Sequence, residues 1–170
     1  MNPEIRNREE WLSQLSVKLG LLFHEDLRDD VKIKITCGWP SSRGLSAARK
    51  RLGECWTDKC SPGGYHEIFI SPLLTDPFEI AGVLVHEMVH VAVGVKERHG
   101  SAFKRCATRM GLIGKMTSTA IGPGLEIVLR AILDGFPAYP HGGLNPALAD
   151  NGRKKQTTRM VKLECPNCGY

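Results

Sequence analysis

Residues 76–90 read DPFEIAGVLVHEMVH, and this stretch predicts the central helix of the fold. Asp76 is a good helix-capping residue, Pro77 fits the first helical position, and Glu79 completes a capping box. Apolar residues then recur on the sides of a helix. The pattern predicts a helix that runs to about Val93, with a glycine after it that can end the helix.

Two histidines in this stretch, His86 and His90, are four residues apart and project from one side of the helix. Imidazole nitrogens at this spacing can share one metal ion, and zinc accepts such ligands. Glu87 follows the first histidine, where it can act as a general base toward water. The alternative is an ordinary amphipathic helix, but a glutamate is costly to bury on an apolar helix without a purpose. We therefore predict a zinc site.

A catalytic zinc ion needs a third protein ligand. The long spacing with a glycine and a third histidine at three-residue intervals is absent, because Val93 and Lys96 hold those positions. His99 is the next candidate, since a turn after the helix could bring it back over the site. Glu97 is the competing ligand, although it sits between basic residues in the connecting turn. Three other histidines have no motif around them: His24, His66 and His141.

The sequence around this helix predicts a small sheet and further helices. Apolar residues recur at helical spacing from about residue 3 to about residue 22. Short segments with strand character follow: Val31–Ile35, Leu52–Trp56 and Tyr65–Ser71. Further helices are expected from Ser101 to Gly111 and over residues 125–133. We expect an α+β fold in which a small, mainly antiparallel three-stranded sheet packs on helices.

Two segments, Glu79–His90 and His99–Lys104, together resemble the SprT-like family of proteases. The pattern of that family is His-Glu-x-x-His followed by a third histidine in a His-Gly-x-x-Phe segment. Upstream, Gly53–Trp56 and Ile68–Leu74 resemble the two strands that precede the active-site helix in the family. The resemblance covers roughly residues 30 to 110.

This resemblance implies a zinc-dependent peptidase domain with a zincin-like active-site helix. His86, His90 and His99 match the three metal ligands of the family, and Glu87 matches the general base. Characterised family members cleave proteins that are crosslinked to DNA or bound on it, and DNA stimulates them. The expected partners are therefore a protein or peptide substrate and DNA.

The formal net charge of +5 and the sequence pI of about 9.0 are compatible with nucleic-acid binding. Two basic runs, at residues 43–51 and 153–162, contain no acidic residue; the alternative for each is a solvated face. Phosphate contacts and base stacking would come from Trp39, Arg43, Arg49, Lys50 and Arg51. We expect a cytoplasmic protein with no membrane partner, because the N-terminus is too charged for a signal peptide and no apolar run approaches a membrane span.

The chain divides into three predicted parts. The peptidase domain occupies residues 1–135, and residues 136–164 form a linker that is first rich in Pro and Gly and then basic. Residues 165–170 hold Cys165 and Cys168, which match the first knuckle of the zinc ribbon that family members often carry. The second knuckle is absent from this sequence, and two thiolates do not fill a tetrahedral zinc site.

Three interpretations of function stay open at this level. The first is a zinc metalloprotease that acts on DNA-associated proteins. The second is a zinc-containing DNA-binding adaptor without turnover, although such a module does not need Glu87 as a base. The third is a cytosolic peptidase whose substrate is unrelated to DNA.

Overall fold

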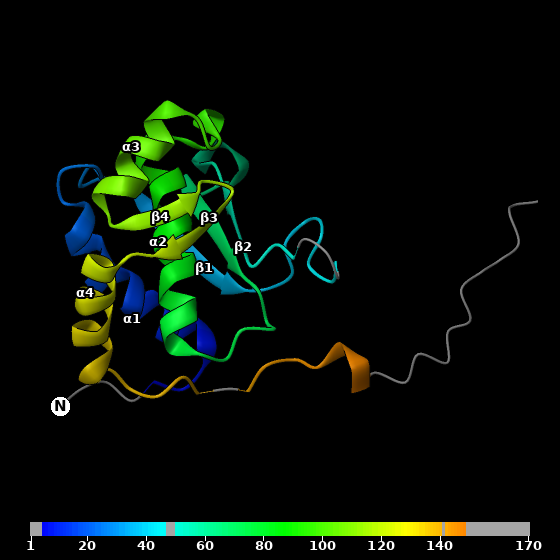
Figure 1. The fold of residues 1–170 in the computed structure, drawn as a ribbon. Coiled ribbons are helices and arrows are strands. Elements are labelled where there is room, and N and C mark those ends of the chain that lie inside the picture. Colours follow the sequence, from blue (N-terminus) through cyan, green and yellow to red (C-terminus); the bar gives the residue numbers. More distant parts are fainter. Residues whose placement is uncertain (1–4, 47–49, 141, 149–170) are drawn as a thin grey trace, which may run out of the picture.

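The computed structural model describes residues 5–46, 50–140 and 142–148. These residues form four α-helices and two small sheets (Figure 1). The α+β class agrees with the sequence prediction. In chain order the elements are α1 (Arg8–Gly20), β1 (Lys32–Cys37), β2 (Gly53–Trp56), β3 (Tyr65–Ile70), α2 (Pro77–Val93), α3 (Ser101–Arg109), β4 (Leu112–Lys115), β5 (Ser118–Ile121) and α4 (Pro123–Asp134). Within the described residues, none of the helices has the length and apolar character that a membrane span requires.

The three-stranded sheet is mixed, so the expectation of a mainly antiparallel sheet is wrong. Strand β3 lies in the middle, in the order β1-β3-β2. It pairs in parallel with β1, with Tyr65 opposite Lys32, and antiparallel with β2, with Ile70 opposite Gly53. The expectation assumed that consecutive strands are neighbours, as in hairpins. The long connection 38–52 instead places β2 on the far side of β3, so β3 runs beside β1 in the same direction.

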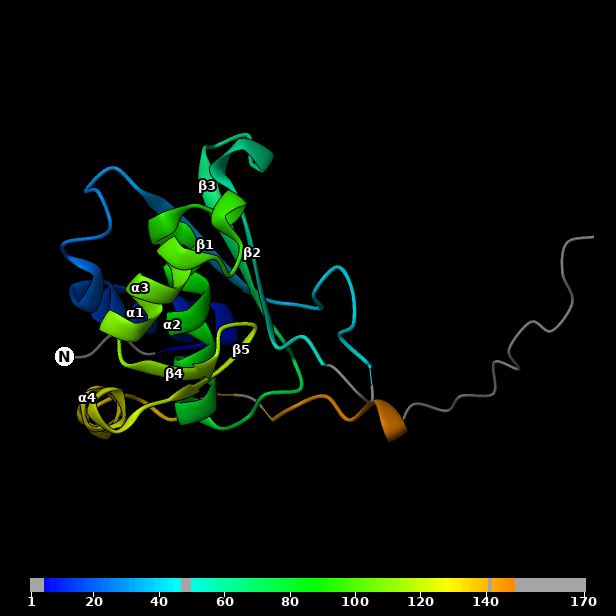
Figure 2. The same cartoon turned by 45° about the horizontal axis from the view of Figure 1, so that its top comes forward.

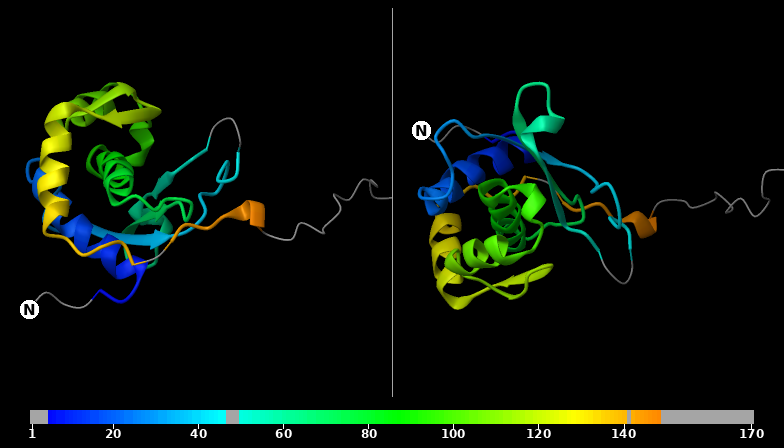
Figure 3. Two further views of the ribbon diagram at one scale, coloured as in Figure 1. Left: turned by 60° about the horizontal axis from the view of Figure 1, so that its bottom comes forward. Right: turned by 90° about the horizontal axis from the view of Figure 1, so that it is seen from above.

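Helix α2 forms the centre of the core, with the sheet on one side and the β4–β5 hairpin on another (Figure 3). Asp76 caps the helix by accepting a hydrogen bond from the N–H of Phe78 at 3.0 Å, and Pro77 lies in the first turn. Both the start of the helix and its end at Val93 agree with the sequence prediction. Several of its apolar side chains are almost fully buried: Ile80, Ala81, Leu84, Val85, Met88 and Val89. Two polar residues of α2, Glu87 and His90, are buried with them.

The second sheet is an antiparallel hairpin of β4 and β5 that the sequence analysis did not predict. Leu112 pairs with Ile121, and Lys115 pairs with Ser118 at the turn. In Figure 2 the hairpin lies across α2. It connects α3 to α4 and brings residues from beyond the recognised motifs next to the central helix.

The chain after α4 packs back on α1 through Trp11. The indole ring meets the rings of Phe136 and Tyr139 edge-on, with centroid distances of 5.2 and 5.0 Å. Its Nε1–H donates a hydrogen bond to the carbonyl of Pro137 at 2.7 Å. The first residues of the predicted linker thus contact the body of the domain, and the domain boundary at residue 135 remains a prediction.

Substitution of Trp11 by alanine should lower the free energy of unfolding by about 3–5 kcal/mol, the usual cost of removing a large buried aromatic side chain. Trp11 is fully buried, whereas Val17 on the same helix is 73% exposed. Val17→Ala is the matched control and should change stability by no more than about 0.5 kcal/mol. Denaturant titration followed by circular dichroism measures both. Equal losses for the two variants would contradict this view of the core.

Candidate metal centre

Three histidine side chains converge beside the C-terminal half of α2. His86 and His90 project from the helix one turn apart, and His99 lies in the segment between α2 and α3. The Nε2 atom of His99 is 3.2 Å from Nε2 of His86 and 3.3 Å from Nε2 of His90. The donor atoms of the three residues all lie within 4.8 Å of one another, so the group can hold one metal ion. The structure thus brings together the three residues that the sequence indicates as ligands.

The spacing of these nitrogens suits a zinc ion. Tetrahedral zinc with Zn–N bonds of about 2.0–2.1 Å separates its nitrogen ligands by about 3.3–3.4 Å. A neutral imidazole has one N–H donor and one acceptor nitrogen, so three Nε2 atoms that face one another cannot all be satisfied by mutual hydrogen bonds. A cation at their centre satisfies all three lone pairs. The donor set therefore fits zinc.

Burial favours the neutral form of the two helix histidines, which is the form that binds metal. Burial and the neighbouring imidazoles lower the pKa of His86 to about 3 and that of His90 to about 4. The ring of Phe103 packs against all three imidazoles, with centroids 4.9, 4.5 and 4.8 Å from those of His86, His90 and His99. Because Phe103 is fully buried, it gives the cluster a fixed apolar side.

A sharp turn after α2 returns His99 to the helix. Gly94 ends α2 with φ of 90°, in the region that favours glycine, and Arg98 has φ of 48°. The N–H of Gly100 donates to the carbonyl of Glu97 at 2.9 Å and closes the turn. The side chain of Glu97, the competing ligand in the sequence, is exposed and lies outside the donor cluster.

Glu87 is the buried acid of this region, with only 6% of its surface exposed. Burial raises the pKa of Glu87 to about 8; the charge of Arg51 opposes this shift and that of Glu54 adds to it. A Cβ atom at Gly53 would lie 2.5 Å from Oε1 of Glu87, so glycine at this position of β2 leaves room for the carboxylate. Burial and then the charge of Arg51 also lower the pKa of His99. One guanidinium therefore acts on both the candidate base and a candidate ligand.

The model of the SprT-like family matches residues 22–122, more than half of the chain. The chain belongs to the SprT-like family. The match starts just after α1, includes the three histidines and Glu87, and ends just after β5. It is wider than the motif resemblance over residues 30 to 110. No curated protein and no solved structure matches the chain.

The SprT-like domain contains one residue at the cluster that the sequence analysis missed. Thr119 of β5 places its Oγ1 atom 2.8 Å from Nδ1 of His86, the ring nitrogen that faces away from the cluster. The corresponding Nδ1 of His90 is buried and has no hydrogen-bond partner among the described residues. Thr119 belongs to no motif and is 33 positions from His86 in sequence, so only the fold reveals the contact.

The predicted nucleic-acid-binding residues lie in the connection between β1 and β2, except that Arg49 is outside the described residues. Trp39 is 41% exposed, and Arg43 and Lys50 are exposed as well. Arg51 is only partly exposed, and its Nη1 atom pairs with a carboxylate of β2 at 2.5 Å. Contact of these residues with nucleic acid remains a prediction. For Arg51 the structure adds an electrostatic influence on Glu87 and His99.

The predicted zinc-knuckle residues Cys165 and Cys168 lie outside the described residues, so a second zinc site remains a prediction. Two other cysteines, Cys55 and Cys60, are conceivable partners for them. Cys55 is buried in β2, while Cys60 is exposed beyond its end. Burial, together with the charge of Glu87, raises the pKa of the Cys55 thiol, which disfavours the thiolate that binds metal.

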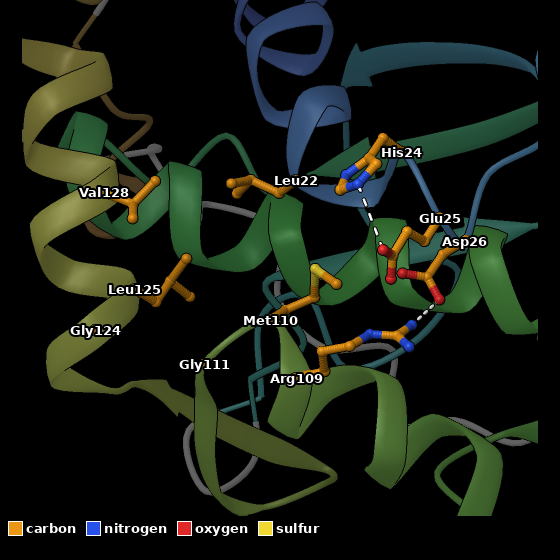
Figure 4. Close-up of a pocket in the computed structure, with 10 residues that line it drawn as sticks. All are labelled: Leu22, His24, Glu25, Asp26, Arg109, Met110, Gly111, Gly124, Leu125 and Val128. Atoms are coloured by element: carbon orange, nitrogen blue, oxygen red, sulfur yellow. Dashed lines mark hydrogen bonds and ion pairs between the residues drawn. The ribbon is translucent and has the colours of Figure 1, made fainter.

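A cavity of about 400 Å³ lies away from the histidine cluster, between the ends of α1 and α3 and the start of α4 (Figure 4). An ion pair between Asp26 and Arg109 lies on its polar side. The lining residues are Leu22, His24, Glu25, Asp26, Arg109, Met110, Gly111, Gly124, Leu125 and Val128. None of the three clustered histidines lines it, so this cavity is separate from the candidate metal centre.

Proposed function

We propose that this chain is a zinc-dependent metallopeptidase. The observation that carries the proposal is the convergence of three histidine Nε2 atoms from α2 and the following turn, with buried Glu87 on the same helix. Three nitrogen ligands leave the fourth position of a tetrahedral zinc ion open, as catalytic zinc sites do. An acid beside such a site is the arrangement used for metal-assisted hydrolysis.

In this proposal the ion is held by His86, His90 and His99. Glu87 on the same helix acts first as the general base and then as the general acid. Zinc, when bound, polarises the scissile carbonyl and lowers the pKa of water to about 7. Glu87 takes the proton of the attacking water and passes it to the leaving amine. Burial raises the pKa of Glu87 in the absence of metal, and the positive charge of a bound zinc ion would favour the carboxylate form that accepts the proton.

The open edge of β2 supports an extended peptide as the substrate. Among the described residues β2 pairs only with β3. The N–H of Ser71 donates to the carbonyl of Leu52 at 2.8 Å, so the alternation of an antiparallel pair directs the backbone of Gly53 and Cys55 toward the open edge. Gly53 lies against Glu87. A substrate strand that added to this edge would pass beside the base.

We further propose that the substrates are proteins bound to DNA. The net charge of +5 and the exposed Arg43 and Lys50 in the connection that leads into β2 support this substrate class. A positively charged loop next to the substrate edge would hold DNA and place proteins on that DNA near Glu87. The role of DNA is then to concentrate the substrate at the site.

The experiment that tests the proposal is digestion of a basic DNA-binding protein by the full chain, with and without DNA and with and without a zinc chelator. Cleavage that requires both zinc and DNA supports the complete proposal. Zinc-dependent cleavage that DNA does not alter favours the peptidase unrelated to DNA. Salt-sensitive DNA binding without cleavage favours the adaptor. Cleavage that survives complete zinc removal would contradict the metal chemistry itself.

A further inference from the structure

Strand β5 lies along α2 with matched side-chain spacing. On the helix, Gly82 and His86 are one turn apart on the same side, about 6 Å along the axis. On the strand, Thr119 and Ile121 are two residues apart on one face, roughly 6.6–6.8 Å along the chain. Ile121 lies over Gly82, and Thr119 lies over His86. Two contacts in register therefore join the hairpin to the helix.

The contact at Gly82 sets how closely the hairpin approaches. A Cβ atom at this position would lie 2.7 Å from Cδ1 of Ile121 and 2.9 Å from its Cγ1, much closer than carbon atoms normally pack. Glycine in a helix interior is unfavourable by roughly 0.5–1 kcal/mol relative to alanine, so it needs a local reason. The reason visible here is the close approach of β5.

The base of the hairpin is fixed as well. The N–H of Gly122 donates to the carbonyl of Gly111 at 2.9 Å, next to the Leu112–Ile121 pair at the open end of the hairpin. Gly111 has φ of 87°, which lets the chain turn from α3 into β4. With its base closed and Ile121 seated on the helix, the hairpin presents the hydroxyl of Thr119 at a defined place.

We propose that the β4–β5 hairpin positions the first metal ligand, with Thr119 as the positioning residue for His86. This inference rests on the metal site of the proposed function. The Nδ1–H of His86 donates to Oγ1 of Thr119, which fixes the imidazole tautomer and the ring plane and leaves Nε2 free for metal. The Gly82–Ile121 contact keeps the hydroxyl within hydrogen-bond distance.

Different contacts orient the two histidines of α2, His86 and His90. Nδ1 of His90 is buried without a hydrogen-bond partner among the described residues, and its ring is the one nearest to Phe103, at 4.5 Å between centroids. Packing therefore orients His90, whereas a hydrogen bond from another element orients His86. Changes in the hairpin should act on His86 first.

The test uses Thr119→Val, which keeps the shape of the side chain and removes the hydroxyl. Zinc affinity, measured by competition with a chromophoric chelator, should fall about 10- to 100-fold, the usual effect of losing the hydrogen-bond partner of a metal-bound histidine. Thr119→Ser keeps the hydroxyl and should stay within a few-fold of wild type. Thr117→Val makes the same chemical change at an exposed position of the hairpin turn and should have no effect.

A second readout needs no metal. Imidazole nitrogen chemical shifts of the zinc-free protein should show His86 as the Nδ1–H tautomer in wild type and Thr119→Ser, and as a mixture in Thr119→Val. Unchanged affinity in Thr119→Val, or reduced affinity with an unchanged His86 tautomer, would overturn the positioning role. A wild-type protein that binds no zinc would instead overturn the proposed function, and the tautomer measurement keeps the two failures distinct.

Gly82→Ala tests whether the Gly82–Ile121 contact sets the distance between the hairpin and α2. Alanine favours the helix, yet its methyl group should displace Ile121 and weaken zinc binding several-fold through the loss of the Thr119 contact. Ile121→Val removes the nearest clashing atom and should recover part of the affinity in the double variant. Wild-type affinity in Gly82→Ala would show that the Gly82–Ile121 contact does not set the spacing.

Discussion

Replacing Glu87 by glutamine should lower the rate of peptide hydrolysis by about 10²- to 10⁴-fold, the usual contribution of a positioned general base. Glutamine has nearly the same shape but cannot accept a proton from water. Because Glu87 is 6% exposed and its pKa is raised to about 8 by burial, a neutral amide at this position should also be tolerated by the fold. Zinc content should stay at one ion per chain, since the three histidines remain.

Glu79→Gln on the same helix is the matched control. Glu79 is exposed in the first turn of α2, away from the histidine cluster, so the same chemical change there should leave the rate unchanged. Rates are measured on the substrate identified by the digestion experiment, at saturating and at limiting concentrations. Full activity in Glu87→Gln with zinc retained would contradict the role of Glu87 as the general base and would mean that another group takes the proton of the attacking water.

Local chemistry explains why α2 could be predicted from sequence almost residue by residue. The signals that start and end this helix act on neighbouring residues: the side chain of Asp76, the ring of Pro77 and the glycine after Val93. The predicted start of α1 at about residue 3 is too early, because apolar spacing alone does not define the residue at which a helix begins. The helix begins at Arg8, where Asn7 accepts from the N–H of Glu10 at 2.9 Å. The sequence contains an Asn-x-x-Glu capping signal at this place, from Asn7 to Glu10.

Non-local contacts explain what the sequence could not predict. The place of β3 between β1 and β2 depends on which strand edges meet after the long connection 38–52, and alternation within each strand does not report that choice. The β4–β5 hairpin was missed because Gly114 interrupts a short apolar segment and the partner strand is polar at Ser118 and Thr119. The Thr119–His86 hydrogen bond therefore had no sequence signal.

The same distinction applies within the candidate site. His86 and His90 are placed by the helical repeat alone, so their proximity follows from the sequence. His99 reaches the other two histidines only if the chain turns sharply after α2. The sequence allows such a turn, and the positive φ values of Gly94 and Arg98 in the structure form it. Arg51 was selected for its charge, as a phosphate contact, and the structure places that charge where it acts on Glu87 and His99. The roles of His99 and Arg51 depend on tertiary contacts, so the local sequence motif predicts them less completely than it predicts the His86–His90 pair.

Substitution of His99 by alanine should remove most of the bound zinc. A tetrahedral site that loses one of three protein ligands keeps only the pair from α2, and the loss should exceed the roughly 10- to 100-fold effect of removing a ligand's hydrogen-bond partner. Metal content per chain, measured by atomic spectroscopy at equal protein concentration and low free zinc, should fall from near one to near zero. Peptidase activity should fall with it.

His24→Ala controls for the loss of an imidazole, because this side chain is 72% exposed and lies outside the cluster. Its zinc content should equal that of wild type. Full zinc retention in His99→Ala would mean that the third ligand lies elsewhere, and the nitrogen spacing of 3.2–3.3 Å would then need another explanation. Nearly two zinc ions in wild type, falling to one in His99→Ala, would instead indicate a second ion outside the histidine site. Cys165 and Cys168, with further ligands, are the predicted place for it.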